Sequence, residues 1–226
     1  MLNKSVRIVC ALLLVGALST VSLSSRSSRW DSSPDSGAVD FPGATFGFLA
    51  DGNKLDWTVA RRVGRLSPYD ALVKKHAEMA GMDWRLLSAI IFHESHYNAE
   101  ACSPMNAKGL MQLRDVVASH FGYEPDSVDL YNPDFNIYLG TRLISDLCED
   151  FRKEGVDSAD VLRFALASYN VGGGSLARRR EEATSQGLDP NSGPDVASVF
   201  SSTGNTTPAY IDAVELTYRR YCQIIK

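Results

Sequence analysis

Residues 83–95 read DWRLLSAIIFHES, and this stretch decides the fold. Asp83 stands where the N-cap of a helix belongs. The residues after it are apolar over much of a helix circumference, through Leu86, Leu87, Ile90, Ile91 and Phe92. A helix of that kind is usually buried inside a protein. The stretch therefore predicts a buried helix whose last turn carries an acidic residue, Glu94.

The composition around this helix is that of an ordinary globular protein. The chain has 226 residues, of which 44% are hydrophobic and 22% are charged. At this length we expect one domain, and the composition excludes collagen, a coiled coil and a mostly disordered chain. The net charge of −4 argues against non-specific nucleic-acid binding, which needs many phosphate contacts from Lys and Arg. Four cysteines are too few for a disulfide scaffold.

Helical patterns flank this stretch on both sides, and no window shows the alternation of a β-strand. Upstream, Ser67-Pro68 predicts a helix start, and Gly81 ends that helix. Downstream, helices are predicted at residues 110–121, 132–152, 158–170 and 176–185, and from Pro208 to the end. Residues 191–207 are polar and rich in Ser, Thr and Gly, and no helix is predicted there. The sequence therefore predicts one mainly α domain over residues 67–226.

The amino terminus has the features of an export signal. Lys4 and Arg7 precede an apolar run over residues 8–18, and a serine-rich stretch follows it. Even residues 8–23 fall short of the ~20 residues that a membrane-spanning helix needs. We therefore expect residues 1–24 to be a secretory signal peptide, with an uncleaved, membrane-associated signal anchor as the alternative. Either form predicts an exported protein of the periplasm or cell envelope.

Residues 25–66 have a mixed Ser, Pro, Gly and Asp composition without a period, which is typical of a linker or N-terminal extension. Cleavage near Ser24 would remove Lys4 and Arg7, leaving 21 basic against 27 acidic residues and a net charge of −6. The cysteines that remain are Cys102, Cys148 and Cys222. An exported chain could join any two of them in a disulfide and keep the third as a thiol.

Glu94 is the residue most suited to chemistry. Ile90 lies one turn earlier on the same helix face, so the carboxyl projects from an apolar surface. A carboxyl in such a place is costly unless it is paired or protonated. Desolvation raises its pKa, which is what a general acid near neutral pH needs. The competing interpretation is a glutamate that turns outward at the helix end and meets a cation.

Glu94 also opens a series of short motifs that follow in order. They are Glu94-Ser95, Gly109-Leu-Met-Gln-Leu113, Asn136-Ile-Tyr-Leu-Gly140, Ala165-Leu-Ala-Ser-Tyr-Asn-Val-Gly172 and Tyr210-Ile-Asp-Ala-Val. With these motifs, the chain resembles the lytic murein transglycosylases of the SLT domain family (glycoside hydrolase family 23) over about residues 67–226. Phe164-Ala-Leu-Ala-Ser-Tyr-Asn resembles the membrane-bound lytic transglycosylase F branch most. Residues 26–66 are too short for the solute-binding-like domain that this branch usually carries.

The resemblance implies a lysozyme-like helical fold with one catalytic carboxyl, that of Glu94. Glu94 would protonate the oxygen of the β-1,4 bond between N-acetylmuramic acid and N-acetylglucosamine. The carboxylate would then take the proton of the muramoyl 6-hydroxyl, giving a 1,6-anhydro product without water. The implied partner is a peptidoglycan glycan strand, bound by a monomer, with no cofactor and no metal.

The resemblance also implies supporting roles for other residues of the motifs. Ser103 and Gln112 would hold the acetamido and lactyl groups of the sugar, and Tyr210 would hydrogen-bond near Glu94 and orient it. The remaining assignments are Ser95 as support of the helix end, Met111 as lining of the groove, and Tyr169 and Asn170 as its floor.

Three of these motifs also have plainer interpretations. Plain core packing accounts for Met111 and Tyr169 as well as sugar contact does, and Asn136 is expected to be structural, hydrogen-bonding a neighbouring segment. In the late motif, Thr206-Thr207-Pro208 stands where the family commonly has a Glu-Thr pair. The exact position of the last helix is therefore open.

Two other functions stay open from the sequence. The first is a muramidase of the same fold, like goose-type lysozyme, which would use water and a second acid. Glu100 and Asp115 are the candidates for that acid. The second is a non-catalytic murein-binding module of an envelope complex, which the presence of Glu94 argues against.

Two further patterns are assigned no chemistry. His93 and His96 are three residues apart, whereas a zinc-protease helix needs two histidines four apart, so no metal is expected. Arg178-Arg179-Arg180 is followed by Glu181-Glu182. Because Arg178 and Glu182 are four apart, this run is interpreted as a solvated helix face.

Overall fold

The structure is a computed structural model that describes residues 64–225. The expected leader, residues 1–24, and residues 25–63 of the expected extension lie outside the described residues. Within residues 64–225 all regular elements are helices, and two isolated β-bridges join parts of one loop. This confirms the mainly α prediction. No helix of this range is both long and apolar enough to cross a membrane.

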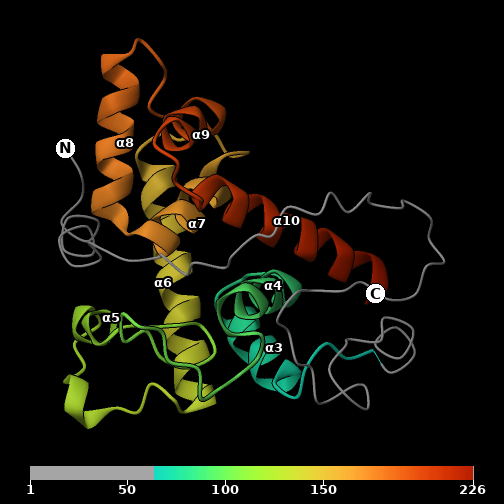
Figure 1. Cartoon of the computed structure of the whole chain (residues 1–226). Helices are drawn as coiled ribbons and strands as arrows, with labels where there is room; N and C mark the ends of the chain where they lie inside the picture. The colour runs from blue at the N-terminus through green and yellow to red at the C-terminus, as the bar shows by residue number, and fades with distance from the viewer. Residues whose placement is uncertain (1–63, 226) are drawn as a thin grey trace.

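The helices gather at two ends of the molecule (Figure 1). In chain order they are α3 (Asp70–Met79), α4 (Trp84–Ser95), α5 (Asp115–His120), a 3-10 turn (Pro125–Ser127), α6 (Pro133–Lys153), α7 (Val161–Val171), α8 (Gly173–Ser185), α9 (Gly193–Ser202) and α10 (Thr207–Ile224). One end holds α3 to α5, the other holds α7 to α9, and α6 runs between them. The last helix, α10, packs against α4 and α7 and so joins the two ends.

The buried helix expected from residues 83–95 is α4. Asp83 caps it by accepting a hydrogen bond from the Arg85 backbone N–H at 2.9 Å. Leu87, Ile90 and Ile91 are fully buried. The sequence pattern therefore placed this helix correctly, with Glu94 in its last turn.

Other boundaries differ from the prediction. The helix predicted at residues 110–121 is the shorter α5, because Gly109 and Gln112 have left-handed backbone with φ of 73° and 47°. The helix α9 was not predicted, although Ser192 caps it by accepting from the Asp195 N–H. Leu66, assigned by sequence to the extension, is buried in the core. The packed part of the chain therefore begins no later than Leu66.

The glycine run at residues 172–174 breaks the helical path, as the sequence indicates. Gly172 has φ of 80° and separates α7 from α8. The last helix, whose position the sequence left open, begins at Thr207, one residue before the predicted Pro208. Its start is held by α7, because the Thr207 hydroxyl donates to Asn170 Oδ1 at 3.0 Å.

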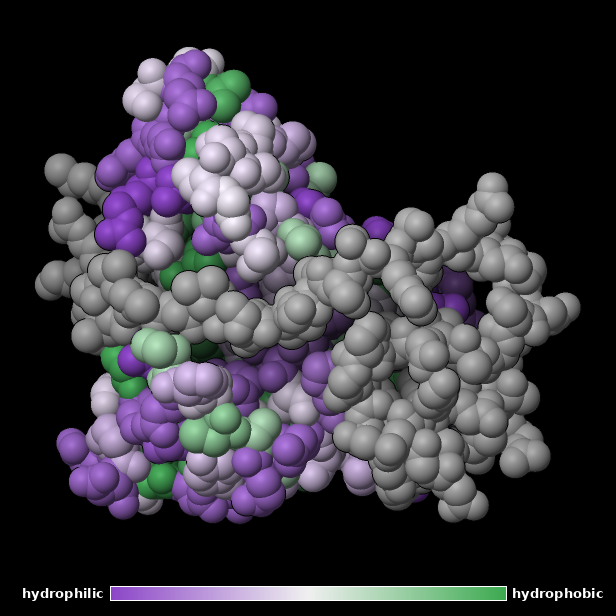
Figure 2. All heavy atoms as spheres, viewed as in Figure 1, coloured by the Kyte–Doolittle hydropathy of each residue, from purple (hydrophilic) through white to green (hydrophobic). Residues whose placement is uncertain are grey.

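The surface and the cysteines add two details. On the face shown in Figure 2, the described residues are mostly hydrophilic, and hydrophobic residues form small separate areas. Cys102, Cys148 and Cys222 are all free thiols in the structure. The disulfide that export would allow is therefore not formed between any two of them here.

Candidate active site

Glu94 meets a tyrosine from the far end of the chain. The Tyr210 hydroxyl, in the first turn of α10, donates to Glu94 Oε1 at 2.6 Å. The two residues are 116 positions apart, so the contact depends on the packing of α10 against α4. This is the hydrogen bond expected of Tyr210.

The surroundings of Glu94 favour its protonated form. Desolvation by the protein raises the pKa of Glu94 from 4.5 to about 7, and the hydrogen bond from Tyr210 acts in the opposite direction. Desolvation is the larger influence, so the carboxyl is near half protonation at neutral pH. Burial and the nearby Glu94 charge raise the pKa of both Tyr210 and Tyr169 well above 10. Both phenols therefore remain protonated hydrogen-bond donors.

A tight turn follows α4 and sends the next loop back beside it. His96 and Tyr97 both have left-handed backbone, with φ of 52° and 61°. The Tyr97 hydroxyl lies 3.1 Å from the Ser88 carbonyl oxygen, to which it donates inside the core. The Ser95 hydroxyl donates to the Leu110 carbonyl oxygen at 2.7 Å. Ser95 thus links the helix end to the returning loop, in the geometry expected of a supporting residue.

Ser103 and Gln112 lie in this returning loop and hold it together. Ser103 Oγ accepts from the backbone N–H groups of Met105 and Ala107. Gln112 Nε2 donates to the carbonyl oxygens of Ala101, at 3.2 Å, and Gly109, at 3.0 Å. Among the described residues, Gln112 Oε1 has no hydrogen-bond partner. The side-chain Oε1 of Gln112 therefore keeps its capacity to accept a hydrogen bond.

Asn136, in α6, holds the loop through its side-chain amide, as expected of a structural residue. It is fully buried, and its Oδ1 accepts from the Met111 N–H at 2.7 Å. Its Nδ2 donates to the carbonyl oxygens of Lys108 and Leu130. Both halves of the amide are thus used to hold residues 108–111 against α6.

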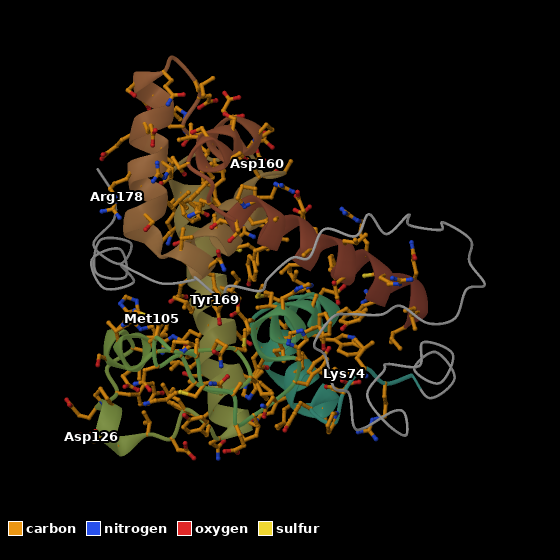
Figure 3. The ribbon with its side chains drawn as sticks, viewed as in Figure 1. Lys74, Met105, Asp126, Asp160, Tyr169 and Arg178 are labelled. Atoms are coloured by element: carbon orange, nitrogen blue, oxygen red, sulfur yellow. The ribbon has the colours of Figure 1, made fainter. Side chains whose placement is uncertain are left out.

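Met111 corrects one expectation. Its side chain is 0% exposed and packs against Gly140 of α6, so it belongs to the core and does not line a groove. Its backbone does face the candidate site, because the Tyr169 hydroxyl donates to the Met111 carbonyl oxygen at 2.7 Å. Figure 3 shows Tyr169 at the level where the two ends of the molecule meet.

Sequence reasoning missed two contacts of α10 near Glu94. Asn170 was expected at the floor of a groove, and its Oδ1 in addition accepts a hydrogen bond from the Thr207 hydroxyl. His93 was considered only for zinc, and its Nε2 lies 2.8 Å from Thr217 Oγ1. One signal for the second contact was present, since His93 directly follows the apolar run that ends at Phe92.

The acids considered for a water-using enzyme form no hydrogen bond with Glu94, whose side-chain partner is Tyr210. Glu100 is exposed, and Asp115 forms an ion pair with Lys108 at 2.7 Å. Neither is among the groups that shift the pKa of Glu94, which are the protein's desolvation and Tyr210. Residues 64–225 contain no cluster of three side chains that could hold a metal.

The geometry can now be compared with known proteins. The model of the transglycosylase SLT domain matches residues 71–190, which is more than half of the chain. The chain belongs to the transglycosylase SLT domain family. The match spans α3 to α8 and includes Glu94, so the site lies within the SLT domain apart from Tyr210 and α10.

Relatives of this SLT domain carry a common name. Membrane-bound lytic murein transglycosylase F of Shewanella pealeana is 32% identical over 169 residues, covering 68% of this chain and 34% of the relative. The protein of that name from Desulfosudis oleivorans is 35% identical over 147 residues, covering 65% of this chain and 30% of the relative. The chain thus spans about a third of the length of these relatives.

A solved structure shows the same fold. An inactive glutamate-to-glutamine mutant of the lytic transglycosylase Slt from Pseudomonas aeruginosa matches with a TM-score of 0.53 and 22% identity. The match covers 74% of this chain and 27% of that one. The lysozyme-like helical fold expected for the SLT domain is therefore confirmed.

Proposed function

We propose that this SLT domain is a peptidoglycan lytic transglycosylase that uses Glu94 as its single acid and base. Its bond would be the β-1,4 linkage between N-acetylmuramic acid and N-acetylglucosamine. The observation that carries the proposal is a carboxyl with a pKa of about 7 that accepts a hydrogen bond from Tyr210 at 2.6 Å. A group near half protonation can both give and take a proton.

The first step uses the protonated carboxyl. Glu94 gives its proton to the glycosidic oxygen as the bond from C1 to that oxygen breaks. The N-acetylglucosamine side leaves with a hydroxyl, and positive charge develops at C1 of the muramoyl sugar. The acetamido group of that same sugar meets this charge, which removes the need for a second protein carboxylate.

The second step uses the carboxylate. Glu94 takes the proton from the muramoyl 6-hydroxyl as that oxygen bonds to C1, which gives the 1,6-anhydro ring and restores the acid. The Tyr210 hydroxyl stabilises the carboxylate between the two steps, because a hydrogen bond from a neutral donor favours the charged form. No water is consumed, so the site needs no residue to activate one.

The remaining residues have supporting roles in the proposal. Gln112 accepts from the acetamido N–H through its free carbonyl oxygen, and Ser103 contacts the lactyl group. Tyr169 and Asn170 form the floor, with Tyr169 held by the Met111 carbonyl oxygen. Ser95 keeps the helix end and the loop in register through Leu110.

The experiment that tests the proposal is mass spectrometry of peptidoglycan sacculi digested by the full chain. Fragments lacking one water relative to hydrolysis products are expected, and Glu94→Gln is expected to release none. The matched controls are Glu100→Gln and Asp115→Asn, which are expected to retain activity. Fragments with free reducing ends would overturn the proposal in favour of a muramidase. Binding without cleavage would overturn it in favour of a non-catalytic module.

We also propose that the protein works in the cell envelope as a monomer. The charged and apolar pattern of residues 1–24 supports export, and the relatives named above are called membrane-bound. Fractionation of cells that express the full chain tests this. The proposal predicts protein in the periplasmic or membrane fraction, and full-length protein confined to the cytoplasm would contradict it.

A further inference from the structure

A polar contact lies inside the interface between α4 and α10, one residue from Glu94. His93 Nε2 and Thr217 Oγ1 are 2.8 Å apart, and Thr217 is buried. Thr217 follows Tyr210 by seven positions, with the fully buried Val214 between them. Residues at this spacing share one face of a helix. The face of α10 that carries the Tyr210 hydroxyl is therefore the face that His93 binds.

His93 also contacts Tyr210 itself. The two rings meet edge to face, with centroids 6.5 Å apart and planes at 80°. Burial, with a smaller contribution from nearby His96, lowers the pKa of His93 to about 4, although a hydrogen bond to the Ala213 backbone opposes this. The imidazole is therefore neutral at working pH, and it brings no charge to the neighbourhood of Glu94.

Other contacts hold α10 at places away from Glu94. The Tyr218 hydroxyl donates to Asp83 Oδ2 at 3.0 Å, at the opposite end of α4. Arg163 of α7 pairs with Asp212 and Glu215 on another side of α10. These contacts dock the helix, but they do not touch the Tyr210 ring or the end of α4 that carries Glu94.

We propose that His93 is a positioning residue, whose hydrogen bond to Thr217 fixes α10 on α4 so that the Tyr210 hydroxyl stays on Glu94. The inference deepens the proposed function and rests on it for the role of Glu94. It assigns to His93 no contact with substrate. The consequence is that Thr217, which contacts His93 and not Glu94, contributes to the acidity of the carboxyl.

The test is the pKa of Glu94 itself, measured by carboxyl ¹³C NMR titration of the full chain, with the signal assigned by its loss in Glu94→Gln. Tyr210→Phe removes a hydrogen bond to a charged group and should raise the pKa by about one unit. His93→Leu and Thr217→Val should each raise the pKa of Glu94 as well. Each should add little to the Tyr210→Phe variant, because both act through that hydroxyl.

Two further variants separate positioning from general damage. His93→Gln places an amide within reach of Thr217 and should return the pKa of Glu94 toward the wild-type value. Tyr218→Phe deletes a hydroxyl from the same pair of helices at their other end and should leave the pKa unchanged. Thr217→Val removes one hydroxyl without changing side-chain shape, so it tests the inference even if His93→Leu folds poorly.

The outcomes distinguish this inference from the proposed function. If Thr217→Val and His93→Leu leave the pKa of Glu94 at its wild-type value while Tyr210→Phe shifts it, His93 has no positioning role. If Glu94→Gln still cleaves peptidoglycan, the proposed function fails, and the titration still decides whether His93 holds Tyr210 on Glu94.

Discussion

The carboxyl of Glu94 is governed by two opposing influences. Desolvation disfavours its charged form, and the Tyr210 hydroxyl favours it. Their balance gives a pKa of about 7, far above the 4.5 of an ordinary glutamate. Desolvation alone would favour the protonated acid of the first step, and the hydrogen bond alone would favour the carboxylate of the second step. Together they allow one group to act in both steps.

The pKa of Glu94 predicts the pH dependence of activity. The first step needs the protonated carboxyl, so kcat/KM should fall as pH rises through about 7. Digestion of soluble glycan fragments from about pH 5 to about pH 9 would measure this. Activity that has already been lost at the acidic end of this range, as an ordinary glutamate with a pKa of 4.5 would give, would show that the pKa of Glu94 is not raised.

The same carboxyl also predicts a pH-dependent stability. Its folded pKa is raised, so the folded state binds the proton more tightly than the unfolded state. Stability is therefore fully present below 4.5 and is lost as pH rises toward about 7. Glu94→Gln removes this loss and should stabilise the protein by about 2 to 3 kcal/mol near pH 8.

Urea unfolding of both proteins at two pH values checks this linkage. Near pH 4 the two should have similar free energies of unfolding, because Glu94 is then protonated in both states of the wild type. A Gln variant that is no more stable than the wild type at the higher pH would mean that Glu94 is well solvated.

Among the elements, the segment at residues 108–113 depends on a distant side chain rather than on its own helicity. Asn136 Oδ1 binds the Met111 N–H, and Asn136 Nδ2 binds two carbonyl oxygens. Gly109 also has no room for a side chain, because a Cβ there would collide with the Leu130 carbonyl oxygen and with Asn136. The segment that carries Gln112 is therefore shaped by α6.

Asn136→Leu should destabilise the protein and displace Gln112. It leaves the Met111 N–H and the Leu130 carbonyl oxygen without partners, whereas the Lys108 carbonyl oxygen keeps the Leu113 N–H. Each unsatisfied group costs about 1 to 3 kcal/mol, so a total loss of about 2 to 6 kcal/mol is expected. Urea unfolding measures that loss, and limited proteolysis at residues 98–113 reports the loosened loop. Unchanged stability and unchanged cleavage would contradict the role given to Asn136.

Local patterns predicted some elements and not others for a physical reason. The helix α4 was predicted because its cap, Asp83, and its apolar face lie within one short stretch. The helix predicted from residue 110 is absent until Asp115, because Gln112 has left-handed backbone and Leu113 pairs with Lys108 across the loop. The helix α9 was missed because its few apolar residues, Val196, Val199 and Phe200, lie within a segment otherwise rich in Ser, Thr and Gly.

The residues of the candidate site also divide into those that local sequence could identify and those that it could not. Glu94 could be singled out from its own helix, because a carboxyl on an apolar face is unusual. The Tyr210 contact was expected only from the family resemblance, since 116 positions separate the two residues. The burial of Met111 and the pairing of His93 with Thr217 depend on how α6 and α10 pack, which no short stretch encodes.

Across the whole molecule, Arg180 links α8 to the segment that follows α6 and to the segment that precedes α9. From α8 it pairs with Glu154 after α6 at 2.6 Å, and it donates to the Pro190 carbonyl oxygen and to Asn191 before α9. Its guanidinium also lies over the rings of Phe151 and Phe164. The sequence interpretation of this arginine run as a solvated face is therefore wrong at Arg180.

The neighbouring Arg178 and Arg179 make contacts only within α8, as expected of arginines on a helix surface. Arg179 pairs with Glu182 within α8, and the two side chains are 29% and 36% exposed. The expected pair of Arg178 with Glu182 is not the one formed, since Arg178 donates to Ser175. The chain thus offers a more buried and a more exposed ion pair on adjacent arginines, which makes a matched comparison.

Arg180→Ala should weaken the attachment of α8 and α9 to the rest of the molecule, whereas Arg179→Ala should not. Arg180 and Glu154 are only 14% and 18% exposed. Removing the arginine therefore leaves the Glu154 carboxylate largely shielded from water and without its cationic partner. A loss of about 2 to 4 kcal/mol is expected at Arg180, against about 0.5 kcal/mol or less at Arg179. Arg180→Lys should recover only part of it, since an ammonium lacks the planar fork that reaches several acceptors. Urea unfolding compares the free energies, and equal losses at the two arginines would mean that Arg180 does not hold α8 and α9 in place.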